Sequence, residues 1–134
     1  MSIFEKAPAG SALRDDSASG AERRRVPRFP FVASAEVVDP KSKSKLNARV
    51  SELSLYGCYV DTINPLPKGA SVFIKIFTTV DFIEANGMVA YVHPNLGMGI
   101  AFFDVNPHFL PILQVWLLRA MREMKANAEE QPTT

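Results

Sequence analysis

The chain has 134 residues, 47% of them hydrophobic, which suits one domain with a buried core. Lysine and arginine total 15 and aspartate and glutamate 14, so the net charge of +1 excludes the strong basic excess of a general DNA-binding domain. A single cysteine, Cys58, excludes an internal disulfide. We recognise no signal peptide, and the most apolar stretch, residues 109–118, is about half a bilayer span. We therefore expect a cytoplasmic protein without membrane insertion.

Strand-like segments begin after a polar N-terminal stretch. Residues 1–22 are rich in Ala, Ser, Gly and charge without apolar periodicity, so we expect a flexible tail there. Six segments bounded by turn residues then have strand composition: 29–38, 46–53, 58–61, 71–77, 82–92 and 97–103. We expect Gly57 to adopt a positive φ in the turn after the second strand, and a bulge near Gly87. Short strands separated by such turns indicate a closed barrel or a sandwich, and we expect an antiparallel barrel within residues 23–105.

A helix is predicted after the last strand, over residues 106–126, with a frayed tail over 127–134. Its apolar residues recur at helical spacings: Phe109, Leu110, Ile112, Leu113, Trp116, Leu117, Met121 and Met124. Asn106 is the expected N-cap. The apolar positions cover most of the circumference, so one face should close the barrel. The remainder should dimerise or dock an effector, unless N-terminal residues fold over it.

Four arginines lie within six positions, immediately before the first predicted strand: Arg23, Arg24, Arg25 and Arg28. Arginine presents a planar fork of donors that engages phosphate oxygens or the O6/N7 edge of guanine, and it stacks on purines. A small anionic ligand suits so narrow a cluster better than a long polyanion does. The alternative is a solvated basic linker.

Two short motifs carry a resemblance to a known family. Residues 24–28, R-R-V-P-R, have the form R-x-x-x-R, and residues 52–57, E-L-S-L-Y-G, are similar to the motif (D/N)-x-S-x-x-G. Together, in this order on a β-rich chain, they resemble the PilZ domain, the cyclic di-GMP receptor domain of bacteria. The resemblance covers about residues 23–103. It implies a six-stranded antiparallel PilZ-type β-barrel with a C-terminal α-helix.

The resemblance also implies a ligand site. Its residues would be Arg23, Arg24, Arg28, Glu52, Ser54 and Gly57, with Arg23 placed to contact a second, stacked ligand copy. Strand alternation puts Glu52 and Ser54 on one face, where the carboxylate can accept from guanine N–H groups and the hydroxyl can bond a base or phosphate. Glutamate departs from the family's Asp or Asn at this position by one methylene. The longer arm implies either weaker binding or a degenerate site.

Two functions remain open from the sequence. The first is a receptor that changes conformation on binding cyclic di-GMP and signals to an unidentified protein effector. The second is an adaptor that binds no nucleotide and acts by protein–protein interaction, with Glu52 and Ser54 as ordinary turn residues. An oligonucleotide-binding barrel is disfavoured by the near-neutral charge. We find no hydrolase, P-loop or metal-binding motif, so no enzymatic activity, cofactor or metal is predicted.

Overall fold

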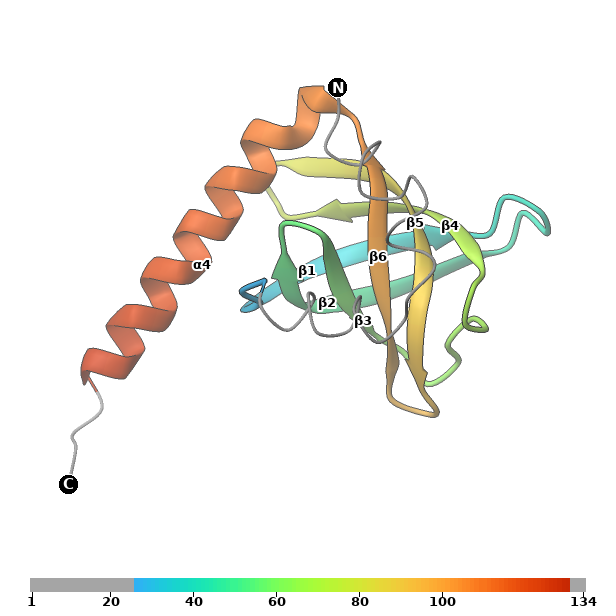
Figure 1. Ribbon diagram of the computed structural model, residues 1–134, viewed down its shortest axis with the longest axis horizontal. Coiled ribbons are helices and arrows are strands. Elements are labelled where there is room, and N and C mark those ends of the chain that lie inside the picture. Colours follow the sequence, from blue (N-terminus) through green and yellow to red (C-terminus); the bar gives the residue numbers. More distant parts are fainter. Residues whose placement is uncertain (1–25, 131–134) are drawn as a thin grey trace.

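The computed structural model describes residues 26–130, which form a six-stranded antiparallel β-barrel followed by one long helix (Figure 1). The strands are β1 (Phe29–Val38), β2 (Lys45–Ser54), β3 (Gly57–Asp61), β4 (Ser71–Phe77), β5 (Phe82–His93) and β6 (Gly97–Val105). A short 3-10 helix, η1 (Pro107–Phe109), leads into α4 (Leu110–Glu130). The predicted fold class is confirmed. The expected flexible tail, 1–22, lies outside the described residues.

Closure of the barrel determines which strands share a surface. The strand order is β1-β2-β3-β6-β5-β4, and β4 pairs back onto β1. The pairing of β3 with β6 joins segments about forty residues apart in sequence, Cys58 opposite Ile100 for example. Because every strand has two partners, no edge is left open to pair with another chain. Strands β2, β3, β6 and β5 therefore form one continuous outer surface.

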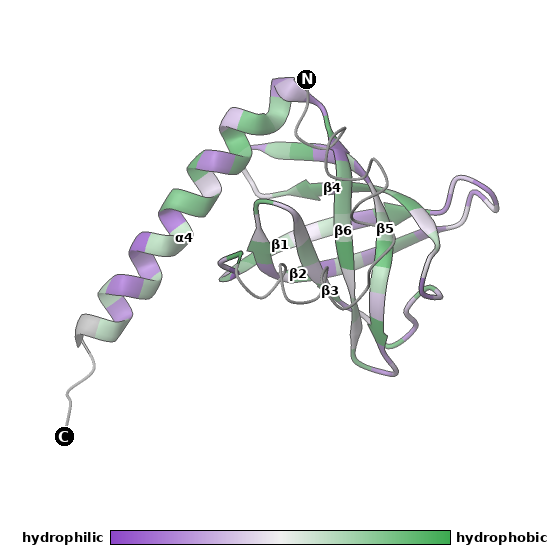
Figure 2. Cartoon of the chain, viewed as in Figure 1, coloured by the Kyte–Doolittle hydropathy of each residue, from purple (hydrophilic) through white to green (hydrophobic). Residues whose placement is uncertain are grey.

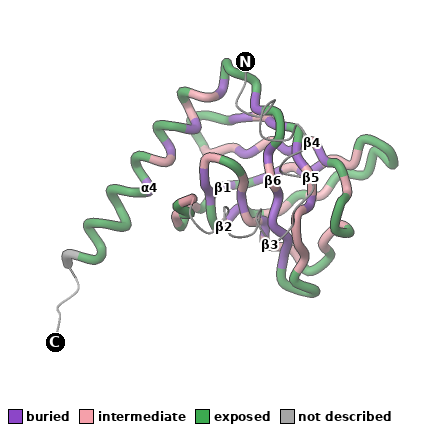
Figure 3. Tube along the Cα trace, viewed as in Figure 1, coloured by how far each residue is buried: buried purple, intermediate pink, exposed green. Residues whose placement is uncertain are grey.

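The core lies inside the barrel, where alternate side chains of each strand point. In β4 the inward residues Val72, Ile74 and Ile76 are at most 2% exposed. Figure 3 shows this alternation as buried segments along the strands. Cys58 is part of this core, and burial raises the pKa of its thiol far above the ordinary value. The thiol is therefore a small apolar group and no nucleophile.

Helix α4 covers the barrel with one face only. Trp116 is 1% exposed and its ring lies 5.1 Å from that of Phe31 on β1, and Leu113 and Ala120 are buried beside it. The predicted closing face is thus confirmed. Every described side chain after Ala120 is exposed, and the helix runs away from the barrel (Figures 1 and 3).

The bounds of the helix differ from the prediction at both ends. Asn106 is a cap, since its Oδ1 accepts from the backbone N–H of His108 at 2.9 Å, but the turn it caps is 3-10 and the α-helix begins at Leu110. The α-helix then continues to Glu130, so the prediction of a frayed tail is wrong for residues 127–130. Strong helix formers such as Ala126 and Ala128 account for the extension. Within residues 26–130, no helix is long and apolar enough to cross a membrane.

Candidate functional site

The second motif, residues 52–57, forms the tight hairpin between β2 and β3. Ser54 pairs with Gly57 across the two-residue turn. The Ser54 hydroxyl accepts from the backbone N–H of Tyr56 at 3.1 Å and donates to the carbonyl of Gly57 at 3.3 Å. Ser54 is only 6% exposed, so its hydroxyl closes the turn. Its contact with a ligand stays a prediction.

Gly57 is required for a reason other than the predicted one. Its φ is not positive, and among the described glycines only Gly69 has a positive φ, so the predicted left-handed conformation is wrong. A Cβ on Gly57 would instead collide with the carbonyl oxygen of Ile100 on β6. The Tyr56 carbonyl also accepts from the N–H of Phe102 on β6, at 2.8 Å. The glycine therefore lets the hairpin approach β6 closely.

A row of outward positions runs from this hairpin across four strands. Glu52 on β2 lies opposite Tyr59 on β3, and Tyr59 lies opposite Gly99 on β6. Gly99 in turn lies opposite Tyr91 on β5. Three strand spacings separate the ends of the row, about 14 Å. Glu52 is exposed and both tyrosines are half-buried, so the row is part of the molecular surface.

The first motif, residues 24–28, contacts the other end of this row, at Tyr91. Arg28 Nη1 donates a hydrogen bond to Tyr91 Oη at 3.1 Å. The structure therefore brings Arg28 and Glu52, 24 positions apart in sequence, to one outer face. Arg23 and Arg24, the other predicted ligand contacts, lie outside the described residues.

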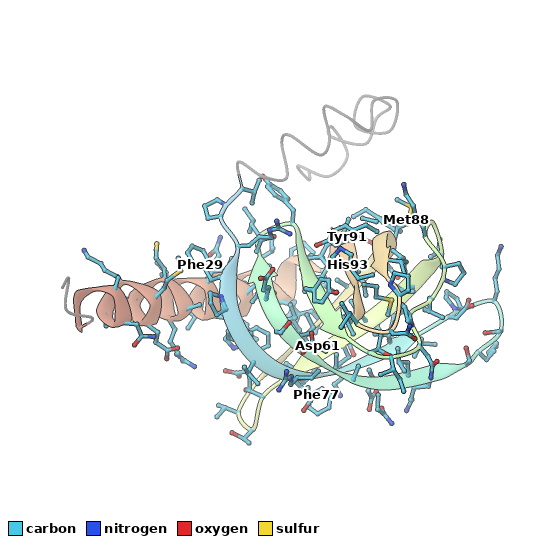
Figure 4. All side chains as sticks on the ribbon, turned by 90° about the horizontal axis from the view of Figure 1, so that it is seen from below. Phe29, Asp61, Phe77, Met88, Tyr91 and His93 are labelled. Atoms are coloured by element: carbon cyan, nitrogen blue, oxygen red, sulfur yellow. The ribbon has the colours of Figure 1, made fainter. Side chains whose placement is uncertain are left out.

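Aromatic rings that sequence reasoning missed lie between the two motifs. The ring centroids of Tyr59 and Tyr91 are 6.2 Å apart, and the His93 ring is 5.6 Å from Tyr59 and 5.3 Å from Tyr91. Figure 4 shows Tyr91 and His93 next to one another. We call Tyr59, Tyr91 and His93 the aromatic cluster. The sequence contained one indication of this cluster: Tyr59 occupies an outward position of its strand, as Glu52 and Gly57 do.

The cluster is held by polar contacts, and acidic groups lie near Tyr59. Tyr59 Oη is 2.9 Å from His93 Nδ1. Burial raises the pKa of Tyr59, and Tyr91, Asp61 and Glu52 raise it further, because the two carboxylates, and Tyr91 once it is ionised, oppose a phenolate. Asp61 itself accepts from Arg49 at 2.8 Å.

This face offers recognition rather than catalysis. It presents a cation, a carboxylate and aromatic rings, which together suit a purine nucleotide. Among residues 26–130, no group of three or more His, Cys, Asp or Glu residues could hold a metal ion.

Comparisons with known proteins identify the architecture. The model of the PilZ domain family matches residues 22–118. A search of curated protein sequences gives no match. Among solved structures, the chain is similar to the PilZ domain of YcgR from Escherichia coli with c-di-GMP, at 18% identity and a TM-score of 0.65, covering 81% of this chain and 99% of that one.

Two further structures have the same fold. The inhibitor of motility from Bacillus subtilis (MotI/DgrA) is 16% identical with a TM-score of 0.61, over 78% of this chain and 52% of that one. The PilZ domain of CeSA from a cellulose-synthesizing bacterium is 15% identical with a TM-score of 0.54, over 72% and 98% of the two chains.

Proposed function

The chain belongs to the PilZ domain family, and from this membership we propose that it is a cytoplasmic receptor for cyclic di-GMP. PilZ domains are non-catalytic receptors, so the chain is not an enzyme. The observation that carries the proposal is the placement of Arg28 and Glu52, one from each motif, on the same outer face of β2, β3, β6 and β5.

The chemistry of these residues matches the two kinds of group in the ligand. Arg28 has five N–H donors and directs one nitrogen at Tyr91, so further donors can reach phosphate oxygens or guanine O6 and N7. Arg23 and Arg24 add charge from the chain just before it. The Glu52 carboxylate accepts from guanine N–H groups, while Ser54 and Gly57 hold the hairpin against β6.

An adaptor that binds no nucleotide is the second candidate. Two observations favour it: glutamate replaces the shorter Asp or Asn at position 52, and the Ser54 hydroxyl already donates its only hydrogen within the turn. Either feature lowers the affinity expected from this face.

Isothermal titration with cyclic di-GMP decides between the two, with GTP and cyclic di-AMP as controls. The receptor proposal expects saturable heat with cyclic di-GMP alone. A chain lacking residues 1–22 should bind like the full chain, and one lacking 1–28 should not bind. No heat at tens of micromolar protein would leave the adaptor as the function.

The output of the receptor is assigned to α4. The helix exposes apolar side chains away from its closing face: Val115 51%, Leu118 48%, Met121 44% and Met124 47%. Figure 2 shows hydrophobic and hydrophilic segments alternating along this helix. Exposed apolar surface of this kind favours docking of a protein effector or of a second copy of the chain. Binding of the ligand by Arg23, Arg24 and Arg28 would change the surface that such a partner meets.

A further inference from the structure

We infer that the aromatic cluster is a purine-stacking platform, on which one guanine of the ligand lies flat with Arg28 and Glu52 at its edges. The inference rests on the proposed function and adds to it a subsite that neither motif contains.

Glycines under the rings make the platform possible. Gly97 and Gly99 occupy outward positions of β6, between β3 and β5. A Cβ on Gly97 would meet the Val60 carbonyl oxygen and come within 2.7 Å of Tyr59 Cε2. One on Gly99 would come within 2.8 Å of Tyr91 Oη and closer still to two atoms of the Tyr91 ring. Both rings therefore lie down over the backbone of β6, where any other residue would push them up.

The rings are fixed before a ligand arrives. The planes of Tyr59 and Tyr91 differ by 30°, so the faces of the two neighbouring rings point in similar directions. Tyr59 is tied to His93 through its hydroxyl, and Tyr91 accepts from Arg28. Little rotamer entropy remains to be lost on binding, which favours affinity.

The groups at the platform's edges distinguish guanine from adenine. A guanine on the rings presents N1–H and N2–H donors on one edge and O6/N7 acceptors on another. Glu52, directly opposite Tyr59, is an acceptor for the first edge. Arg28, at Tyr91, is a donor for the second. Adenine lacks both O6 and N1–H, so it would leave the carboxylate without a donor.

The test distinguishes the contribution of the Tyr91 ring to ligand binding from that of its hydroxyl. Tyr91→Phe keeps a stacking surface and loses the bond to Arg28, while Tyr91→Leu loses both. Titration with cyclic di-GMP should show Tyr91→Leu and Tyr59→Leu weaker by about ten- to a hundredfold, and Tyr91→Phe within a few-fold of the unmodified chain. Phe77→Leu, at the opposite side of the barrel in Figure 4, is the matched control and should bind normally.

Gly99→Ala provides a second variant that leaves both tyrosines in the chain. The atoms its Cβ would meet belong to the flexible end of Tyr91, so the ring moves and the barrel stays folded. Binding should weaken as it does for Tyr91→Leu, with little change in the unfolding midpoint. In NMR spectra of the bound ligand, the guanine H8 proton should shift upfield, because it lies over a ring.

Two failures can be told apart. If the unmodified chain binds cyclic di-GMP and the leucine variants bind within twofold of it, the platform is overturned and the receptor stands. If the unmodified chain does not bind, the receptor is overturned. The platform is then decided by millimolar 5′-GMP: ring-proton shifts of Tyr59 and Tyr91 support it, and unchanged rings overturn it.

Discussion

Arg28 Nη1 and Tyr91 Oη are 3.1 Å apart across 63 positions of sequence, which ties the segment before β1 to the far side of the barrel. The hydrogen bond gives the arginine a defined place on the face that also carries Glu52. Ligand groups arriving there meet a guanidinium that is already positioned.

Replacing Arg28 tests the use of this guanidinium. Arg28→Ala should weaken cyclic di-GMP binding by about 1.5–3 kcal/mol, ten- to a hundredfold, because a charge-assisted contact is lost. Arg28→Lys should also bind poorly, since an ammonium has no planar fork. Arg49→Ala is the matched control: Arg49 is an exposed arginine paired with Asp61, and its loss should leave the titration unchanged. Equal weakening by both alanines would indicate a general charge effect.

Glu52 is the position where the chain departs from its family, and the departure is testable. Glu52→Asp should tighten cyclic di-GMP binding because the shorter arm has fewer rotamers to lose, and Glu52→Ala should weaken it because guanine donors lose their acceptor. Glu52 is exposed, so the unfolding midpoint of either variant should stay nearly constant. An aspartate variant that binds no better than the original chain would show that the longer arm is already accommodated.

Local patterns predicted the strands well because each strand has clear boundaries. The predicted bounds of β1 and β4 match the structure, since Pro and Gly turns flank runs of apolar and β-branched residues. The bulge expected near Gly87 is confirmed by a register shift between Asn86 and Gly87.

The parts that sequence could not predict depend on closure of the barrel. Tyr59 and Tyr91 become neighbours only because β3 and β5 both pair with β6 and a glycine lies between them. Gly57 likewise has no positive φ, and its role depends on a carbonyl 43 residues away, that of Ile100. Such contacts are long-range and leave no local period to detect. The C-terminal end of α4 was placed too early, at residue 126 instead of Glu130, because the prediction followed apolar periodicity, which ends at Met124, rather than helix propensity.

The reason for glycine at position 57 predicts a stability effect. Gly57→Ala should destabilise the barrel by about 1–3 kcal/mol, because the new methyl group meets a backbone carbonyl that cannot move without shifting β6. Gly99→Ala is the control, since the nearest atoms that its methyl group would meet belong to the Tyr91 side chain and not to the backbone. Urea unfolding of the two variants should therefore differ clearly. Equal stability would mean that the β2–β3 hairpin relaxes away from β6.

The raised pKa of Tyr59 predicts alkaline sensitivity. The folded state favours the neutral phenol, so its contribution to stability is complete below the ordinary tyrosine pKa of 10.0 and is lost as pH rises through the higher folded value. The free energy of unfolding should thus fall above pH 10.0, and less so in Tyr59→Phe, which has no phenol to ionise. Parallel urea titrations of both proteins at increasing pH measure the difference. Identical pH profiles would contradict the shift.

Helix α4 combines a packed half and a projecting half, and substitutions should separate them. Leu113, fully buried, closes the barrel, so Leu113→Ala should cost about 2–5 kcal/mol of stability. Leu118→Glu and Met121→Glu change side chains that are 48% and 44% exposed, so the unfolding midpoint should barely move. If α4 carries the output, these two variants should lose self-association in analytical ultracentrifugation, or effector binding, while still binding cyclic di-GMP. A chain that is strictly monomeric, and whose α4 amide resonances stay unchanged when ligand binds, would rule out this role and leave the ligand face intact.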